Sequence, residues 1–251
     1  MPFIDTHCHV DLYPDYRNVL EETEAAEIYT IAVTNTPSVF RRCLSLTQHT
    51  RFVRAALGLH PQLASQRHHE LELMFEMLAE TRYIGEVGLD YVTTDLDERK
   101  LQQMVFERIL EHCAAFPEKI ITVHSRRATS EVVRLIGESY PCTIILHWFS
   151  GTQRELRDAI AAGFNFSANS AMLMSEKGRK LLSKIPIDRL LTESDGPFVT
   201  IDSKPARPKN IPTTVSGLAE LFGMSAEDMS ATIYSNFRRV LKNDRTGASC
   251  L

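Results

Sequence analysis

The feature that most constrains the fold is a repeat, in which short apolar runs rich in Val, Ile and Phe alternate with longer segments of helical spacing. This alternation is typical of strand–helix units built around a parallel sheet. Eight runs are predicted to be strands, at residues 3–10, 28–35, 52–60, 83–90, 119–125, 143–149, 164–170 and 189–195. Eight such units close into an α/β barrel of the TIM (β/α)8 type, and 251 residues suffice for it. We therefore expect a single domain over residues 1–251, with a flexible tail from about residue 243.

The segments between the runs predict the helices. The clearest helix is expected over residues 96–116, where apolar side chains share one face opposite charged ones. Others are expected to begin near Tyr16, Ser38, His68, Ala128, Thr152, Ser175 and Thr213, with an additional C-terminal helix over residues 226–241. Ser38 and Thr152 are suited to be N-caps, and Gly163 stands where a helix must stop. Residues 202–212, rich in Pro, Lys and Arg, are expected to form a loop at the active site.

Charge and cysteine usage exclude several classes of protein. The chain has 28 basic and 32 acidic residues, mixed along its length, so it lacks the basic surface of a protein that coats nucleic acid. Its five cysteines are odd in number and form no C-x-x-C pair, which argues against a disulfide framework or a zinc knuckle. No export signal or membrane-spanning run is apparent. We expect a cytoplasmic protein with no membrane contact.

Side chains that bind metals stand at the late positions of five predicted strands. They are His7, His9, Glu86, His124, His147 and Asp195. Taken singly, each has an ordinary interpretation, such as a histidine bound to backbone, an acid paired with arginine or a turn residue. Taken together, they would each need a separate buried partner, whereas a shared dication satisfies all six. The chemistry of a TIM barrel lies at the carboxyl ends of its strands, so we expect the six to converge there.

The number of ligands indicates two ions rather than one. Six protein ligands exceed the three of a usual catalytic zinc, and a carboxylate such as Glu86 can bridge two metals about 3.5 to 4 Å apart. His7, His9 and Asp195 are expected to hold one ion, and His124 and His147 the other. Imidazole ligands suit zinc, manganese or iron better than magnesium, but the identity stays open among them.

These residues lie within longer motifs that resemble a known family. The motifs are residues 3–11 (FIDTHCHVD), 58–61 (GLHP), 84–91 (IGEVGLDY), 123–126 (VHSR), 146–151 (LHWFSG) and 191–195 (LTESD). Together they resemble the TatD-type metal-dependent deoxyribonucleases of the amidohydrolase superfamily. Gln102, Gln103 and Phe106 also match that pattern, so the resemblance spans most of the chain.

The resemblance implies a barrel that uses two divalent ions to hydrolyse phosphodiester bonds in DNA. It further implies a 3′–5′ exonuclease acting on single-stranded rather than duplex DNA, in DNA repair or phage defence. Glu86 would be the bridge, Asp195 the base, and His60 and Arg126 the substrate-binding residues, with Glu193 behind the ligands. Roles of this kind involve partner proteins, although no motif identifies one.

Several alternatives stay open. The same scaffold suits a hydrolase of a small amide, lactone or phosphoester, or a metal-bound subunit of a larger assembly. Cleavage of DNA or RNA, and exo- or endonuclease action, are not distinguished. Arg126 could instead form a salt bridge on the rim, and Ile211 occupies a position where the family commonly has glutamate.

Two groups of residues near the motifs have an open role. Trp148 and Phe149 either stack on a base or pack the rim of the site. Scattered basic residues either lead a single strand to the site or are merely solvated; they are Arg127, Arg154, Lys204, Arg207 and Lys209.

Overall fold

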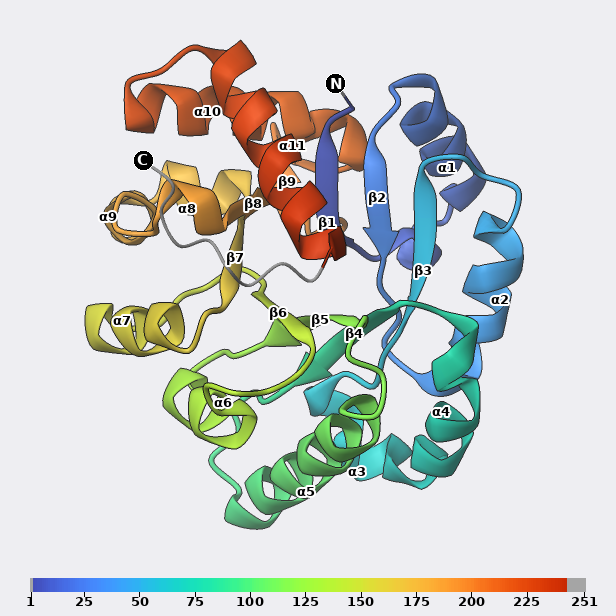
Figure 1. Ribbon diagram of the computed structural model, residues 1–251. Helices are drawn as coiled ribbons and strands as arrows, with labels where there is room; N and C mark the ends of the chain where they lie inside the picture. The colour runs from blue at the N-terminus through green and yellow to red at the C-terminus, as the bar shows by residue number, and fades with distance from the viewer. Residues whose placement is uncertain (1, 243–251) are drawn as a thin grey trace.

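The computed structural model describes residues 2–242 and is built on eight parallel strands that follow one another in chain order (Figure 1). The strands are β1 (Ile4–Cys8), β2 (Tyr29–Ala32), β3 (Val53–Leu57), β4 (Tyr83–Gly88), β5 (Ile120–His124), β6 (Thr143–Leu146), β7 (Asn165–Ala168) and β8 (Leu190–Thr192). The predicted TIM barrel is confirmed, and each strand is shorter than its apolar run. Most runs begin one residue before the strand, and each extends one to three residues beyond its end.

The first and last strands meet without a regular ladder within residues 2–242. The Thr6 hydroxyl donates a hydrogen bond to the backbone oxygen of Thr192 at 3.0 Å, and the Thr192 hydroxyl donates to the backbone oxygen of Ile4. Above them, the Asp195 amide donates to the backbone oxygen of His7 at 2.9 Å. These bonds bring β8 against β1, so the barrel is nearly closed.

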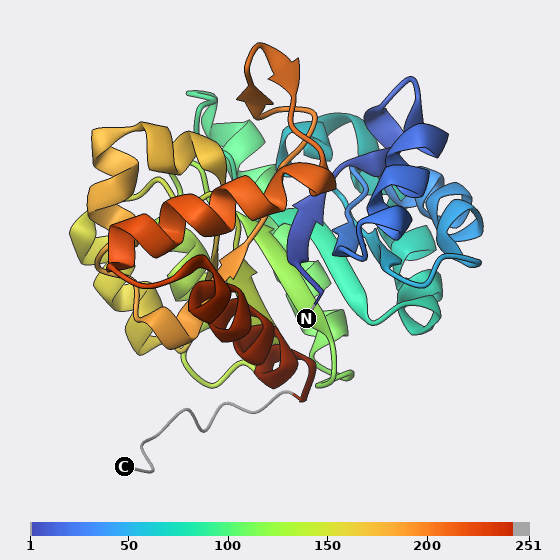
Figure 2. The same cartoon turned by 90° about the horizontal axis from the view of Figure 1, so that it is seen from above.

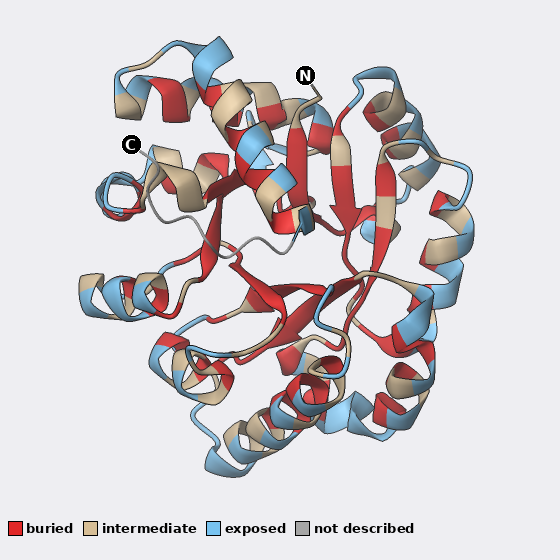
Figure 3. Ribbon diagram, viewed as in Figure 1, coloured by how far each residue is buried: buried red, intermediate tan, exposed pale blue. Residues whose placement is uncertain are grey.

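Helices surround the strands, which are buried almost throughout (Figure 3). They are α1 (Tyr16–Ala25), α2 (Pro37–Thr47), α3 (Ala64–Arg67), α4 (Leu71–Met77), α5 (Leu96–Cys113), α6 (Thr129–Ile136), α7 (Gln153–Ala161), α8 (Ser170–Met174), α9 (Glu176–Leu182), α10 (Ile211–Phe222) and α11 (Ala226–Lys242). Short 3-10 turns occupy Val10–Leu12, Pro61–Leu63, His68–Glu70, Leu78–Glu80, Ile187–Arg189 and Pro208–Asn210. No helix within residues 2–242 is long and apolar enough to cross a membrane.

The predicted helix ends are right in part. Thr152 caps α7 through a reciprocal pair of bonds with Glu155, and Gly163, with a φ of 82°, follows the end of that helix. Ser38 is not an N-cap, because α2 already begins at Pro37, a residue suited to the first helical position. The Ser38 amide instead donates to the Glu70 carboxylate at 2.8 Å, so a residue distant in sequence caps α2.

The segment after β8 contains a hairpin that was predicted only as a loop. Strands β9 (Thr200–Ile201) and β10 (Lys204–Pro205) pair antiparallel across Asp202 and Ser203, both of which have positive φ. The hairpin stands out from the mouth of the barrel (Figure 2).

The predicted C-terminal helix is confirmed as α11. The Asn236 side-chain amide donates to the backbone oxygens of Ile187 and Leu190, at 2.7 and 2.8 Å, and fixes the helix beside β8. The predicted tail from about residue 243 lies outside the described residues.

Candidate metal centre

A cavity of about 590 Å³ opens at the carboxyl ends of the strands. Seven of the eight predicted site residues line it: His9, His60, Glu86, His124, Arg126, His147 and Asp195. The eighth, His7, is fully buried beside His9 and Glu86. The barrel therefore gathers at one place all the side chains that the sequence analysis selected, although they come from strands far apart in the chain.

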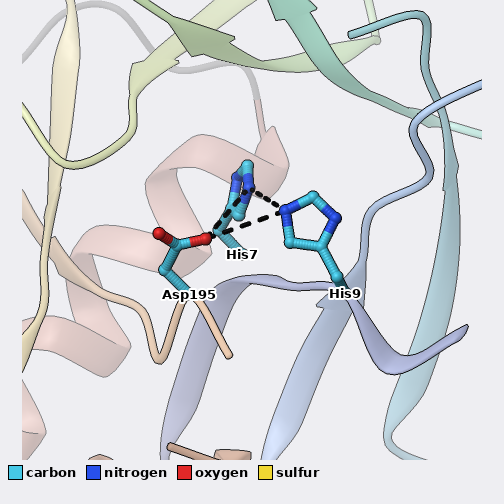
Figure 4. A group of neighbouring side chains, drawn as sticks. All are labelled: His7, His9 and Asp195. Atoms are coloured by element: carbon cyan, nitrogen blue, oxygen red, sulfur yellow. Dashed lines mark hydrogen bonds and ion pairs between the residues drawn. The ribbon is translucent and has the colours of Figure 1, made fainter. Parts of the chain in front are cut away.

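His7, His9 and Asp195 form the first group of ligand-type atoms (Figure 4). The Nε2 atoms of the two histidines are 3.3 Å apart, and Asp195 Oδ1 lies 3.8 and 3.7 Å from them. Glu86 Oε2 completes the group, at 3.5 Å from His7 Nε2 and 3.3 Å from His9 Nε2. A tetrahedral ion with bonds near 2.0 to 2.1 Å has ligand atoms about 3.3 Å apart, so these four atoms are spaced to surround one cation.

The other oxygen of Glu86 faces a second group of ligand-type atoms. Its Oε1 lies 2.6 Å from His124 Nδ1 and 2.8 Å from His147 Nε2, and those two nitrogens are 3.1 Å apart. Each carboxylate oxygen thus addresses a different set of histidines. This is the arrangement expected of a carboxylate that bridges two metals.

Partners behind the histidines set the direction in which their nitrogens point. His7 Nδ1 lies 2.8 Å from the Thr122 hydroxyl, and His124 Nε2 lies 2.9 Å from the Asp90 carboxylate. Gln62 in turn donates to Asp90 at 2.8 Å. Such contacts fix the ring and leave its other nitrogen free for a ligand. Thr122 and Asp90 were not predicted to be site residues, although Asp90 stands in one of the motifs given above.

Four buried carboxyl groups lie around the two groups of ligand-type atoms. Burial raises the pKa of Asp5 to about 7 and, with the charge of Asp5 nearby, that of Glu193 to about 8. Burial together with the charges of Glu193 and Glu86 raises the pKa of Asp195 well above its usual value. Burial alone would also raise the pKa of Glu86, but the facing histidines lower it. Such a cluster fits divalent cations, which would offset the mutual repulsion.

Glu193 lies at the base of the cluster, as the resemblance implied. Its carboxylate accepts hydrogen bonds from the Ser167 hydroxyl, from the Asn169 side chain at 2.9 Å and from the Trp148 amide at 3.0 Å. Its Oε2 is 3.9 Å from His147 Nδ1. Ser167 and Asn169 were missed because single polar residues in a buried strand or after it give no sequence signal of their partner.

Two residues at the mouth have a left-handed backbone that non-glycine residues rarely adopt. The φ of Trp148 is 39° and that of Asp195 is 44°. Strain of this kind costs on the order of 1 to 3 kcal/mol and gathers at functional sites. Here it turns the chain sharply after β6 and β8, directly after His147 and at Asp195 itself.

His60 and Arg126 lie on the open side of the cavity. His60 Nδ1 accepts from the Gln62 amide at 3.2 Å, so the proton of the neutral ring is on Nε2, 3.4 Å from Glu86 Oε1. His60 is close enough to Glu86 and His124 to share an ion, but a protonated Nε2 donates rather than ligates. Arg126 is exposed, and within residues 2–242 no carboxylate forms the alternative salt bridge with it.

The structure also decides two open alternatives in part. Phe149 is 1% exposed and packs edge to face on Phe166, so it belongs to the core, while Trp148 is partly buried and lines the cavity. Arg207 pairs with Asp15, just before α1, and with Glu22 on α1, and Lys209 also pairs with Glu22. These two cations are therefore neutralised rather than held free for a strand of DNA.

Comparison with known proteins places the chain among metal-dependent hydrolases. The model of the family described as TatD related DNase matches residues 4–242. YjjV of Escherichia coli is 28% identical over 250 residues, with 93% of this chain and 95% of YjjV covered. YabD of Bacillus subtilis is 28% identical over 253 residues, with 95% and 98% covered; both are described as uncharacterized metal-dependent hydrolases. The crystal structure of E. coli YjjV superposes with a TM-score of 0.86 at 25% identity, covering 95% of this chain and 97% of that one.

Proposed function

Because the chain belongs to the TatD-related DNase family of metal-dependent hydrolases, we propose that it is a two-metal deoxyribonuclease that hydrolyses phosphodiester bonds. The observation that carries this proposal is the placing of Glu86. Its two oxygens face two separate groups of histidine nitrogens, as a bridge between two phosphate-activating ions requires.

The six proposed ligands divide between the two ions as their distances suggest. His7, His9 and Asp195 would hold one ion, His124 and His147 the other, and Glu86 would bridge them. When bound, two divalent ions lower the pKa of water and stabilise the charge of the attacking and leaving oxygens. Zinc, manganese and magnesium are the candidates to test, because the ligand set combines imidazole and carboxylate.

Three residues of the cavity would bind the substrate or accept the proton of the attacking water. Asp195, a member of the first group, also lines the cavity, where its carboxylate would accept the proton of the attacking water. His60 Nε2 and the Arg126 guanidinium would donate hydrogen bonds to the non-bridging phosphate oxygens. Arg126 is exposed and His60 is partly exposed, so both can meet an incoming substrate.

The size of the cavity favours an unpaired end of the strand. At about 590 Å³ it is in the range of small-molecule sites, so it suits one or two nucleotides rather than a duplex. We therefore propose exonuclease action on single-stranded DNA, with 3′–5′ polarity as the family resemblance implies.

The test is digestion of oligonucleotides by protein that has been stripped of metal and reloaded. Single-stranded and duplex DNA, and RNA of the same sequence, are labelled at either end and sampled over time with zinc, manganese or magnesium. We expect a ladder that shortens from the 3′ end of single-stranded DNA, and two ions per chain by elemental analysis. Cleavage that persists without metal, or hydrolysis of a small amide or lactone with no cutting of DNA, would contradict the proposal.

A further inference from the structure

One large aromatic side chain at the mouth of the metal centre is left exposed. Phe198 lines the cavity, yet 58% of it is accessible to solvent. Trp148, the other large aromatic residue lining the cavity, packs partly against the core. Burying a phenylalanine side chain is favourable by about 1.5 to 3 kcal/mol, so an exposed ring at this place offers binding energy to a ligand.

Phe198 is fixed close to the proposed ligands. It follows Asp195 by three residues, and its amide donates to the backbone oxygen of Asp195 at 2.9 Å. Its ring meets the His9 ring edge to face, with 5.0 Å between the centroids and 87° between the planes. A flat group lying on Phe198 would therefore be next to a phosphate bound at His9 and Asp195.

The backbone that carries Phe198 is clamped at the neck of the hairpin. A Cβ on Gly196 would lie 1.9 Å from the Tyr13 hydroxyl and 2.0 Å from the Ala206 oxygen, so three segments meet there without spare room. The Tyr13 hydroxyl also donates to that Ala206 oxygen. Arg207 then binds Asp15 at 2.7 Å. A ring on such a support loses little freedom when a ligand binds to it.

The cationic groups and the proposed metal ligands of the cavity suit a phosphate rather than a base. His60 and Arg126 present N–H donors, and the six predicted ligands present anionic or imidazole groups. Leu63, Trp148 and Phe198 supply the apolar lining. A nucleotide has both a phosphate and an aromatic face, and this division of the cavity matches it.

We propose that Phe198 is the platform on which the nucleobase beside the hydrolysed phosphodiester stacks. This rests on the proposed nuclease function and adds to it the residue that holds the base. Stacking of a base on an aromatic side chain is worth about 5- to 150-fold in binding and tolerates every base, because each has an aromatic face. An unpaired nucleotide offers that face freely, so the platform favours single strands whatever their sequence.

The experiment compares two oligonucleotides that differ only in one base. One has a normal nucleotide at the end that the enzyme removes, and the other carries a tetrahydrofuran abasic residue there. Phe198→Ala and Phe198→Leu should lower kcat/KM on the normal oligonucleotide by about 5- to 150-fold and leave cleavage of the abasic one unchanged. Phe198→Trp should retain the wild-type preference. Leu96→Ala is the matched control, because Leu96 is 66% exposed and lies outside the cavity lining.

The outcomes separate this inference from the function on which it rests. Equal losses on both oligonucleotides would mean that Phe198 acts only through His9, and unchanged cleavage by Phe198→Ala would mean that it binds no base; either overturns the platform alone. A wild-type enzyme that cuts no DNA overturns the nuclease proposal and the platform with it. Metal content measured for each variant shows whether the centre has stayed intact.

Discussion

His9 Nε2 lies 3.3 Å from Glu86 Oε2, although His9 directly follows β1 and Glu86 lies in β4, and these two strands do not pair with each other. The barrel thus brings them together across its mouth rather than along a ladder. Glu86 is 2% exposed and reaches both histidine groups from this position. The proposed centre depends on this one side chain more than on any other.

We expect Glu86→Gln to abolish cleavage, because an amide keeps the shape of the side chain but cannot bridge two cations as an anion. The loss of kcat should exceed the roughly 10- to 100-fold typical of residues that only support a ligand. Kinetics on a labelled oligonucleotide and elemental analysis measure the two effects. A variant that keeps both its ions and its rate would exclude Glu86 as the bridge.

Chelation of divalent ions should lower the melting temperature of the wild-type protein. The buried carboxylates of Asp5, Glu193 and Asp195 would then lose the cations that offset their repulsion. At a free metal concentration 100 times Kd, binding adds about 2.7 kcal/mol of stability, or roughly 5 to 10 °C in a chain of this size. Thermal scans with chelator and with added metal test this, and Glu86→Gln should shift less. Identical melting curves would argue against a metal centre.

Asp90→Ala should weaken activity through the orientation of His124. The Asp90 carboxylate lies 2.9 Å from His124 Nε2, and loss of such a support typically costs about 10- to 100-fold in metal affinity or rate. Excess metal should restore part of the rate if the defect is in affinity. The conservative Asp90→Asn variant can still form a hydrogen bond to the His124 ring. Its rate is expected to lie between those of the wild type and Asp90→Ala. A rate equal to wild type would leave Asp90 with a structural role only.

Glu70 should make stability depend on pH at the acid side. Burial would raise the pKa of Glu70, but hydrogen bonds from Ser38 and the charge of Arg67 outweigh it and lower the pKa. A lowered folded pKa means that the contribution is complete above the unfolded value, about 4.3, and is lost as the pH falls through the folded value. Glu70→Ala should therefore cost about 0.5 to 2 kcal/mol at pH 7. Urea unfolding at pH 7 and pH 3 should show this difference shrinking at pH 3; a constant difference would contradict the assignment.

Gly58→Ala should prevent folding of the mouth of the barrel. A Cβ at Gly58 would lie 2.1 Å from the Thr34 oxygen and 2.4 Å from the Glu86 amide nitrogen, and neither backbone can move without displacing the site. We expect a loss above about 4 kcal/mol or no soluble protein. Gly223→Ala is the control, because only its left-handed φ of 67° opposes a side chain there and the cost is about 1 to 2 kcal/mol. Equal stability of the two variants would refute the clash.

The sequence predicted those features that depend on the type and position of single residues along the chain. Apolar runs and the polar residues at their ends predicted the barrel and the convergence of residues such as His7 and His147, since strand ends of a parallel barrel meet at one face. Contacts between strands had no such signal. Thr122 contacts His7 on β1, and Asn169 donates to Glu193 just after β8. A polar residue in one strand gives no indication in the sequence of which residue it will contact in another.

The chain after β8 was harder to predict for the same reason. Its basic residues left a path for DNA open, but Arg207 and Lys209 both bind Glu22 of α1, which is far away in sequence. Phe198, which follows Gly196 and Pro197, was given no role from the sequence. Only the packing around Gly196 shows that the backbone holds its ring out over the cavity.

The seam between β1 and β8 has a consequence for how the protein matures. Hydrogen bonds of the Thr6 and Thr192 hydroxyls join the two strands within the barrel. At the carboxyl ends of the same two strands lie His7, His9 and Asp195. An ion bound by those three residues would hold β1, the first strand, against β8, the last strand of the barrel. In the newly made polypeptide, binding of the metal and closure of the barrel would then occur together.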